Sequence, residues 1–436
     1  MTNCISEQIR LPGCRGRKVE AEFSGQAITS DGGSALLRAA DTLIDLIPRV
    51  AKTFSDSRRK ASCDHSIEDL LKQRVYALAL GYEDLNDHDE LRNDIALQTS
   101  VGRDVELASS STLCRLENSV DKGSLWGLSQ ILVDVFLESY DSPPDEIILD
   151  FDSTDDKVHG NQVGRFFHGY YDHYCFLPLY VFCGHHLLAA YLRPSKIDNA
   201  KHAKAILGLL VKQIRQAWPD VRIIYRADSG FCRWKTMRWC DKNNVSYILG
   251  LAKNSRVSAK ADWLRLEAHL RFLETGEKQK LFGEVCYGAK KWDRERRVIV
   301  KAEHLPKGAN PRYVVTNVDG EPAEIYQEYC MRGEMENRIK EQQLYLFADR
   351  TSCTQWLPNQ FRLLLSGLAY TLLNTIRSIG LKNTDLSRAR CDTIRLKLLK
   401  IGAAVVRNTR RVRLLFSSAY PYKRLFRLVV ARLCPG

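Results

Sequence analysis

The chain has 436 residues, of which 44% are hydrophobic and 27% charged, and its formal net charge is +13. This composition is ordinary for a soluble protein with two or three domains. No apolar run reaches the roughly 20 residues needed to cross a bilayer, and the amino-terminal residues lack the apolar core of a secretory signal. We therefore expect a cytoplasmic protein with no membrane partner.

The amino-terminal third is predicted to be helical. "SALLRAADTLIDLIPRVAKTF" and "SIEDLLKQRVYALALGY" carry apolar residues at three- and four-residue spacing, and Ser66, followed by Glu68 and Asp69, is a suitable helix start. The paired prolines of "DSPPDE" end this pattern. Residues 1–140 are predicted to form a helical N-terminal domain.

A mixed α/β layer follows. "EIILDFDST", "YCFLPLYVFCG", "HLLAAYLRP", "VRIIYRADSG" and "SYILGLA" read as strands, with amphipathic helices between the later ones. Residues 255–321 are charged and helical at first and then strand-like, which predicts a β-rich insertion. The layer itself is predicted to comprise residues 145–254 and 322–385.

The segment "YCMRGEMENRIKEQQ" is predicted to form a helix with an unusual polar face. On a regular helix, Tyr329, Arg332, Glu336, Lys340 and Gln343 fall within about 80° of one another. A surface ladder of i,i+4 ion pairs is one explanation of such a face. A site that meets metal ions and phosphate is the other.

Most of the net charge is concentrated near the carboxyl end. Residues 388–436 contain thirteen Lys or Arg and one acid, Asp392. A basic C-terminal region, residues 386–436, suits a polyanion such as nucleic acid through counterion release. A solvated basic surface or a membrane-facing helix is the alternative.

Two of the predicted strands end in acids. Asp150 and Asp152 point to one face of the first strand, and Asp228 follows a later strand. Carboxylates at the carboxyl ends of neighbouring strands converge where ligands bind in open α/β sheets, and their oxygens suit Mg²⁺ or Mn²⁺. Taken singly, each aspartate is also explained as a cap of a turn or helix.

These motifs together resemble DDE transposases of bacterial insertion sequences, specifically the group with a Y-x(2)-R-x(3)-E-x(6)-K signature. The resemblance includes "LDFDSTDDKVHG", "GRFFHGYYDHYCFLPLY", "LRPSKIDNA", "RADSGFC" and "MENRIKE". It assigns the catalytic and metal-binding acids to Asp152, Asp228 and Glu336, with Asp150 as the alternative for the first. Gln343 stands where the signature has lysine, and Lys340 lies one turn earlier on the same face.

The resemblance also implies a fold and a reaction. The fold is a ribonuclease H-like mixed sheet with flanking helices, and two Mg²⁺ ions, which Mn²⁺ can replace, would serve cutting at transposon ends and joining to target DNA. The residues expected to contact DNA are Tyr329, Arg332 and Lys340 at phosphate, and Tyr313 or Trp292 as the ring that stacks a flipped base of a hairpin intermediate. The helical domain would bind terminal inverted repeats, and a homodimer would act on paired ends in the nucleoid. A catalytically inactive DNA-binding relative and a metal-dependent nuclease without strand transfer are the alternatives.

Overall fold

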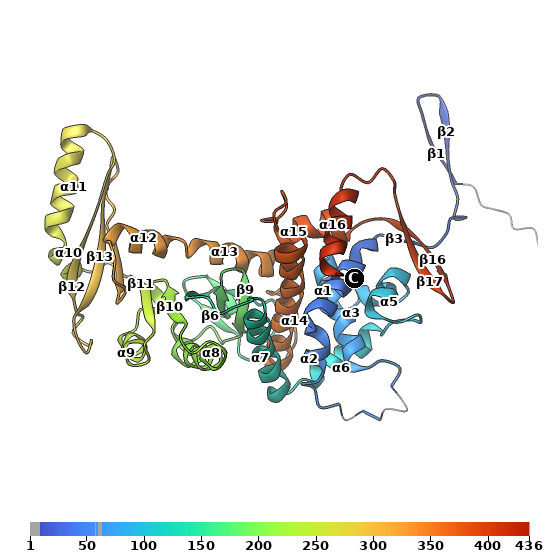
Figure 1. The fold of residues 1–436 in the computed structure, drawn as a ribbon, viewed down its shortest axis with the longest axis horizontal. Coiled ribbons are helices and arrows are strands. Elements are labelled where there is room, and N and C mark those ends of the chain that lie inside the picture. The colour runs from blue at the N-terminus through green and yellow to red at the C-terminus, as the bar shows by residue number, and fades with distance from the viewer. Residues whose placement is uncertain (1–8, 57, 60–62, 436) are drawn as a thin grey trace, which may run out of the picture.

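The computed structural model describes residues 9–56, 58–59 and 63–435. A large sheet with its helices occupies one side of the molecule, and a helical region occupies the other, with helix α14 between them (Figure 1). Within the described ranges, no helix is long and apolar enough to cross a membrane.

The sheet has nine strands in the order β12-β13-β15-β11-β10-β4-β8-β9, with β14 paired to β13. Strand β10 runs parallel to both β4 and β11, and the remaining pairs are antiparallel. The predicted mixed α/β sheet with flanking helices is therefore confirmed. The strand bounds are β4 (Glu146–Ser153), β8 (Leu179–Cys183), β9 (His186–Tyr191), β10 (Arg222–Ala227), β11 (Ser246–Leu251), β12 (Gln279–Tyr287), β13 (Arg296–Leu305), β14 (Gly308–Ala309) and β15 (Arg312–Thr316).

The two faces of the sheet are covered by different helices. Alternation sends Ile147, Leu149 and Phe151 of β4 into the larger core on one face, whereas Ile148 packs in a smaller cluster on the other. The helices that cover the larger core are α8 (Ala203–Ala217) and α9 (Trp234–Lys242), and the opposite face carries α12 (Pro322–Cys330) and α13 (Gly333–Lys340) (Figure 1). Ile148, Asp150 and Asp152 of β4 thus face the side of the sheet that carries α12 and α13.

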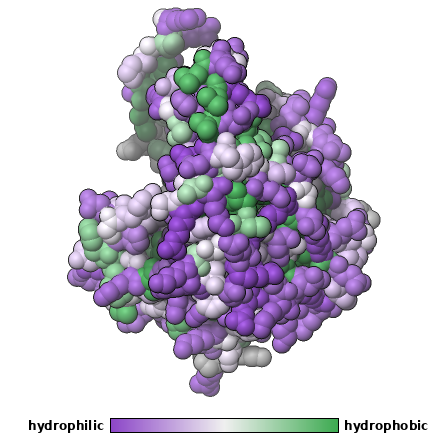
Figure 2. All heavy atoms as spheres, turned by 90° about the vertical axis from the view of Figure 1, so that its left-hand side faces the viewer, coloured by the Kyte–Doolittle hydropathy of each residue, from purple (hydrophilic) through white to green (hydrophobic). Residues whose placement is uncertain are grey.

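Residues 255–321 continue this sheet, because β15 pairs with β11 and carries β13 and β12 beyond it. Two helices belong to this part, α10 (Ser255–Lys260) and α11 (Asp262–Thr275). Helix α11 buries Leu264 and Ala268 against the strands, and its opposite side exposes a stripe of large apolar side chains, Trp263, Leu266, Leu270 and Leu273. Figure 2 faces this side of the molecule and shows apolar side chains gathered on its upper part.

The helical region contains α1 (Ala35–Ile44), α2 (Leu46–Ala51), α3 (Ile67–Leu80), α4 (Asp87–Leu91), α5 (Ile95–Val101), α6 (Ser110–Ser119) and α7 (Lys122–Glu138). Helix α3 begins as expected: Ser66 accepts from the backbone of Asp69, whose carboxylate returns a bond to the backbone of Ser66. Helix α14 (Trp356–Thr375) is buried along nearly its whole length and contacts α3, α6, α7 and β9. Its apolar sequence therefore joins the helical region to the sheet.

The C-terminal region folds onto the helical region. Its elements are α15 (Cys391–Ile394), η6 (Arg395–Leu399), β16 (Ala403–Asn408), β17 (Arg411–Phe416) and α16 (Lys423–Leu433), and β16 pairs with β3 (Ile28–Thr29). Part of its charge is used internally, since Arg395 donates to backbone carbonyls of α3 and Lys400 pairs with buried Asp31 at 2.7 Å. Arg407, Arg410, Arg411 and Arg413 remain exposed around the β16–β17 turn. The hairpin β1 (Ile9–Cys14) and β2 (Arg17–Ala21) projects from the same side (Figure 1).

Candidate active site

The three predicted acids lie at one end of the sheet. Asp152 is the penultimate residue of β4, Asp228 follows the last residue of β10, and these parallel neighbours bring both to the same edge. Glu336 lies on α13, which packs against β4. The structure therefore brings together side chains from three distant parts of the sequence.

One guanidinium joins two of these acids. Arg332 donates to Asp152 Oδ2 and to Glu336 Oε1, each at 3.0 Å. Asp228 instead accepts from the backbone N–H of Gly230 at 2.8 Å, which caps the short turn η3 (Ser229–Phe231). The i,i+4 Arg332–Glu336 pair expected of a surface ladder is present, but it extends to an acid of the sheet.

The electrostatics of the site are dominated by Asp152, whose side chain is 15% exposed. Its pKa is raised to about 6, chiefly by burial and also by the charges of Asp228 and Glu336, whereas Arg332 opposes the rise. Carboxylates that perturb one another in this way lie in a site that is short of positive charge. A group with this pKa is a functional-site candidate.

The predicted single helix from Tyr329 to Gln343 is divided in the structure. Hydrogen bonds of the i→i−3 type at residues 332, 334 and 335 tighten the chain between α12 and α13, and η4 (Glu341–Tyr345) follows as a π-helical turn. Tyr329 therefore lies in the last turn of α12. Its hydroxyl lies over Gly250, where an added Cβ would stand 2.5 Å from it and 2.8 Å from the backbone nitrogen of Ser229. Burial raises the Tyr329 pKa, so the hydroxyl keeps its proton for donation.

Asp150, the alternative first acid, is occupied elsewhere. It receives two bonds from Arg226, at 2.6 and 2.7 Å, and Arg226 also reaches the carboxylate of Glu328 on α12 at 2.7 Å. This buried network, which sequence reasoning missed, fixes α12 to the sheet. It leaves Asp152 as the acid of β4 that meets Glu336.

Gln343 points away from the acids. Its amide donates to the backbone carbonyl of Asp155 at 2.9 Å and to the carboxylate of buried Asp156 at 3.1 Å. Lys340 is exposed and has no ion pair with the described residues. Of these two positions, Lys340 is the one whose side chain is free to meet phosphate.

The two aromatic candidates for base stacking do not lie beside the acids. Tyr313 on β15 is 3% exposed and its hydroxyl meets that of Ser258, so its ring is inaccessible to a base in this conformation. Trp292 precedes β13, and the pairing of Arg297 with Thr316 puts it toward the opposite end of the strands from Asp228. Strand alternation alone could not decide which face of β15 carries the tyrosine.

The carboxylates fit a hard cation by chemistry, since all three supply oxygen ligands, and burial together with the charges of Asp228 and Glu336 raises the pKa of Asp152. Across the described part of the chain, no group of three or more His, Cys, Asp or Glu side chains is positioned to hold a metal ion. In this arrangement the Arg332 guanidinium supplies the positive charge between Asp152 and Glu336. A bound cation would take over that role.

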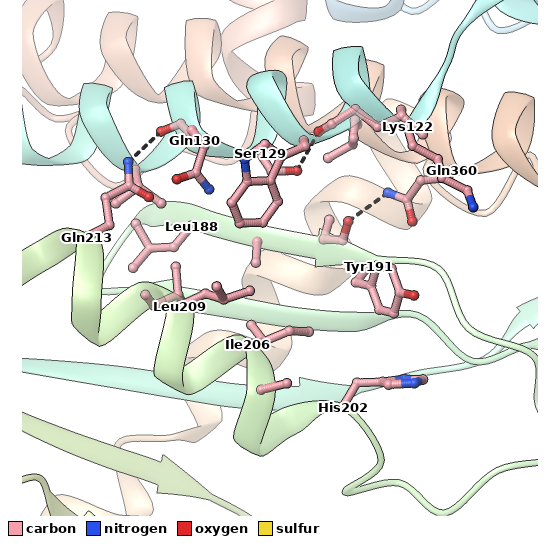
Figure 3. Close-up of a pocket in the computed structure, with 18 of the residues that line it drawn as sticks. Lys122, Ser129, Gln130, Leu188, Tyr191, His202, Ile206, Leu209, Gln213 and Gln360 are labelled. Carbon is pink, nitrogen blue, oxygen red and sulfur yellow. Dashed lines mark hydrogen bonds between the residues drawn. The ribbon is translucent and has the colours of Figure 1, made fainter. Parts of the chain in front are cut away.

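A separate apolar cleft of about 450 Å³ lies between α7, α8, β9 and α14 and does not include the acids (Figure 3). Leu188, Ile206 and Leu209 line it, and its amides are engaged: Gln360 donates to the carbonyl of Ala190 at 2.9 Å. It offers an apolar surface and none of the carboxylate chemistry described above.

Comparisons with known proteins identify the family of the chain. No curated protein matches the sequence. Among solved structures, a piggyBac transposase synaptic complex with hairpin DNA, studied by cryo-electron microscopy, is similar with a TM-score of 0.42 and 11% identity, over 86% of this chain and 83% of that one. The sequence model of the family described as "Transposase DDE domain group 1" matches residues 11–435. The chain therefore belongs to this family of DDE transposases.

Proposed function

We propose that the protein is a cut-and-paste transposase of a bacterial insertion sequence that cleaves DNA at transposon ends and joins them to target DNA, with a hairpin intermediate. The observation that carries this proposal is the meeting of Asp152, Asp228 and Glu336 at one end of the sheet, with Arg332 between two of them. The strand order β9-β8-β4-β10-β11 supports a ribonuclease H-like core. The protein would act in the cytoplasm, on the nucleoid.

The three acids would hold two Mg²⁺ ions, or Mn²⁺ in their place, and such ions activate the attacking water or 3′-hydroxyl and stabilise the leaving oxygen. Arg332, once its carboxylates are otherwise neutralised, is free to grip a phosphate with two N–H groups. Tyr329 would donate its hydroxyl to the same phosphate. Lys340, which is exposed on α13, would add a point charge.

DNA would extend from the acids toward the helical region. We assign end binding to residues 1–140, catalysis to 145–254 and 322–385, and added phosphate contacts to 386–436; the exposed arginines around the β16–β17 turn support this division. Two ends need at least two protein copies, so we propose a homodimer. The exposed apolar stripe of α11, within 255–321, is a surface available for that contact.

The test is an assay with the purified protein, labelled DNA from the borders of the element, a target plasmid and Mg²⁺. Joined product supports the transposase; cutting without joining would replace it by a nuclease, and retention without cutting by an inactive DNA-binding relative. Asp152→Ala, Asp228→Ala and Glu336→Ala should each abolish cutting and leave DNA retention intact. Glu334→Ala, at an exposed position of α13, is the matched control and should cut like the wild-type protein. Cutting by any of the three acid variants would move the active site elsewhere.

A further inference from the structure

We propose that the hairpin formed by β6 (Phe166–His168) and β7 (His173–Phe176) is a stacking platform for unpaired DNA bases beside the acids. This inference rests on the proposed function and assigns the base contact to residues that the sequence patterns did not single out. The hairpin joins β5 (Asp156–Lys157) in a small sheet of order β5-β7-β6.

The hairpin exposes an unusual amount of aromatic surface. The exposed fractions are 39% for Phe166, 53% for Phe167, 84% for Tyr170 and 47% for Tyr174. Neighbouring rings meet edge to face: Phe167 and Tyr174 have centroids 5.7 Å apart at 73°, and Tyr170 meets Tyr171 at 5.0 Å and 85°. Each edge-to-face contact covers one face of one ring, and the exposed fractions show that the rest of this aromatic surface is open to a base.

The platform is tied directly to the catalytic strand. Strand β5 begins three residues after β4 ends, and its Asp156 pairs with Phe176 of β7. His173 Nε2 lies 2.7 Å from Asp155 Oδ2, and the same loop is held by Gln343. The pKa of Tyr171 is raised to about 12, chiefly by burial and also by the nearby charges of Asp155 and Asp152.

Cations accompany the rings, which favours nucleic acid over an apolar peptide as the occupant. The Arg165 guanidinium lies 4.6 Å from the centre of the Tyr174 ring, and the Lys196 ammonium lies 5.7 Å from that of Phe166. Rings that take bases next to cations that take phosphates are the features of single-strand binding surfaces. The occupant we assign is therefore an unpaired base of the strand cut at the acids.

The test compares a DNA duplex that contains one unpaired 2-aminopurine with a fully paired duplex. The fluorescence of 2-aminopurine falls when the base stacks on a ring. The full-length wild-type protein, in Ca²⁺ to prevent turnover, should quench the probe and bind this duplex more tightly than the fully paired one. Phe167→Ala and Tyr170→Ala should lose about tenfold of that preference and leave affinity for paired DNA unchanged. Leu209→Ala removes an apolar side chain of similar exposure on α8 and should behave as the wild-type protein.

An unchanged preference in both hairpin variants, or an equal loss on paired DNA, would overturn the platform. Asp228→Ala, which removes a proposed catalytic acid, should still quench the probe. Failure of the proposed function gives a different result, namely a wild-type protein that prefers the unpaired base and does not cut.

Discussion

Arg332→Ala tests the charge balance of the candidate site most directly. The Arg332 and Asp152 side chains are 18% and 15% exposed, and their ion pair spans 3.0 Å. Breaking a fully buried pair costs about 3–5 kcal/mol, whereas an exposed pair, such as that with the 47% exposed Glu336, is worth about 0–1 kcal/mol. Allowing for partial exposure, we expect the variant to lose about 2–4 kcal/mol of unfolding free energy in metal-free buffer.

Divalent ions should stabilise Arg332→Ala more than they stabilise the wild-type protein. In the wild-type protein a cation must replace the guanidinium, whereas in Arg332→Ala the carboxylates are already without a counter-charge. Because a ligand stabilises by RT ln(1 + [L]/Kd), the variant should gain more unfolding free energy than the wild-type protein at the same Mg²⁺ concentration.

Urea unfolding in EDTA and in a Mg²⁺ series measures both effects. Lys340→Ala removes an exposed cation from the same helix and should change the unfolding free energy by no more than about 0.5 kcal/mol. If Arg332→Ala matches Lys340→Ala in EDTA, the guanidinium does not neutralise the acids, and the reasoning is refuted.

Three further outcomes are expected. Cutting should fall as pH drops through about 6, because Asp152 takes up a proton there. In EDTA, the raised pKa of Asp152 in the folded protein should make the free energy of unfolding decrease as pH rises from about 4 to about 6. Urea titrations of Asp152→Asn should not show this decrease. Glu341→Ala should cost about 3–5 kcal/mol of unfolding free energy, because it leaves the buried Arg377 guanidinium, which donates to Glu341 at 2.9 Å, without its carboxylate. The exposed Glu334→Ala should cost about 0.5 kcal/mol. Leu270→Glu on α11 should sediment as a smaller species than the wild-type protein in analytical ultracentrifugation, whereas Leu396→Glu, which is exposed in η6, should not. Equal sedimentation of Leu270→Glu and the wild-type protein would exclude the α11 stripe as the dimer contact.

The sequence was sufficient for the parts of the site that follow from local periodicity. Alternation along β4 separates Leu149 and Phe151, which enter the core, from Asp150 and Asp152, which face α12 and α13. The same alternation could not tell the two aspartates apart. That distinction depends on Arg226 of the neighbouring strand, which takes one of them into a buried pair.

Sequence patterns could not predict properties that depend on partners distant in the chain. Gln343 occupies the signature lysine position, but its direction is set by β5, which lies 187 residues away in the chain. A count of cations could not separate Arg395, held by backbone carbonyls, from Arg411 on the surface. Helical spacing likewise assumed one regular helix, whereas the tightened turn near Arg332 changes the direction in which that side chain points.

Two ion-pair systems on the same face of the sheet explain how the site combines rigidity with exchangeable charge. Arg226 is 7% exposed and bound by both Asp150 and Glu328, so removing Asp150 or Arg226 would leave a buried charge without its main partner. Arg332, which lies between α12 and α13, pairs with one mostly buried acid and one half-exposed acid, and solvent reaches its partner Glu336. The first system fixes the position of α12 on β4 and β10. In the proposed reaction, a metal ion would replace the guanidinium at the carboxylates of the second system, and the released guanidinium would bind phosphate while the first system keeps the backbone in place.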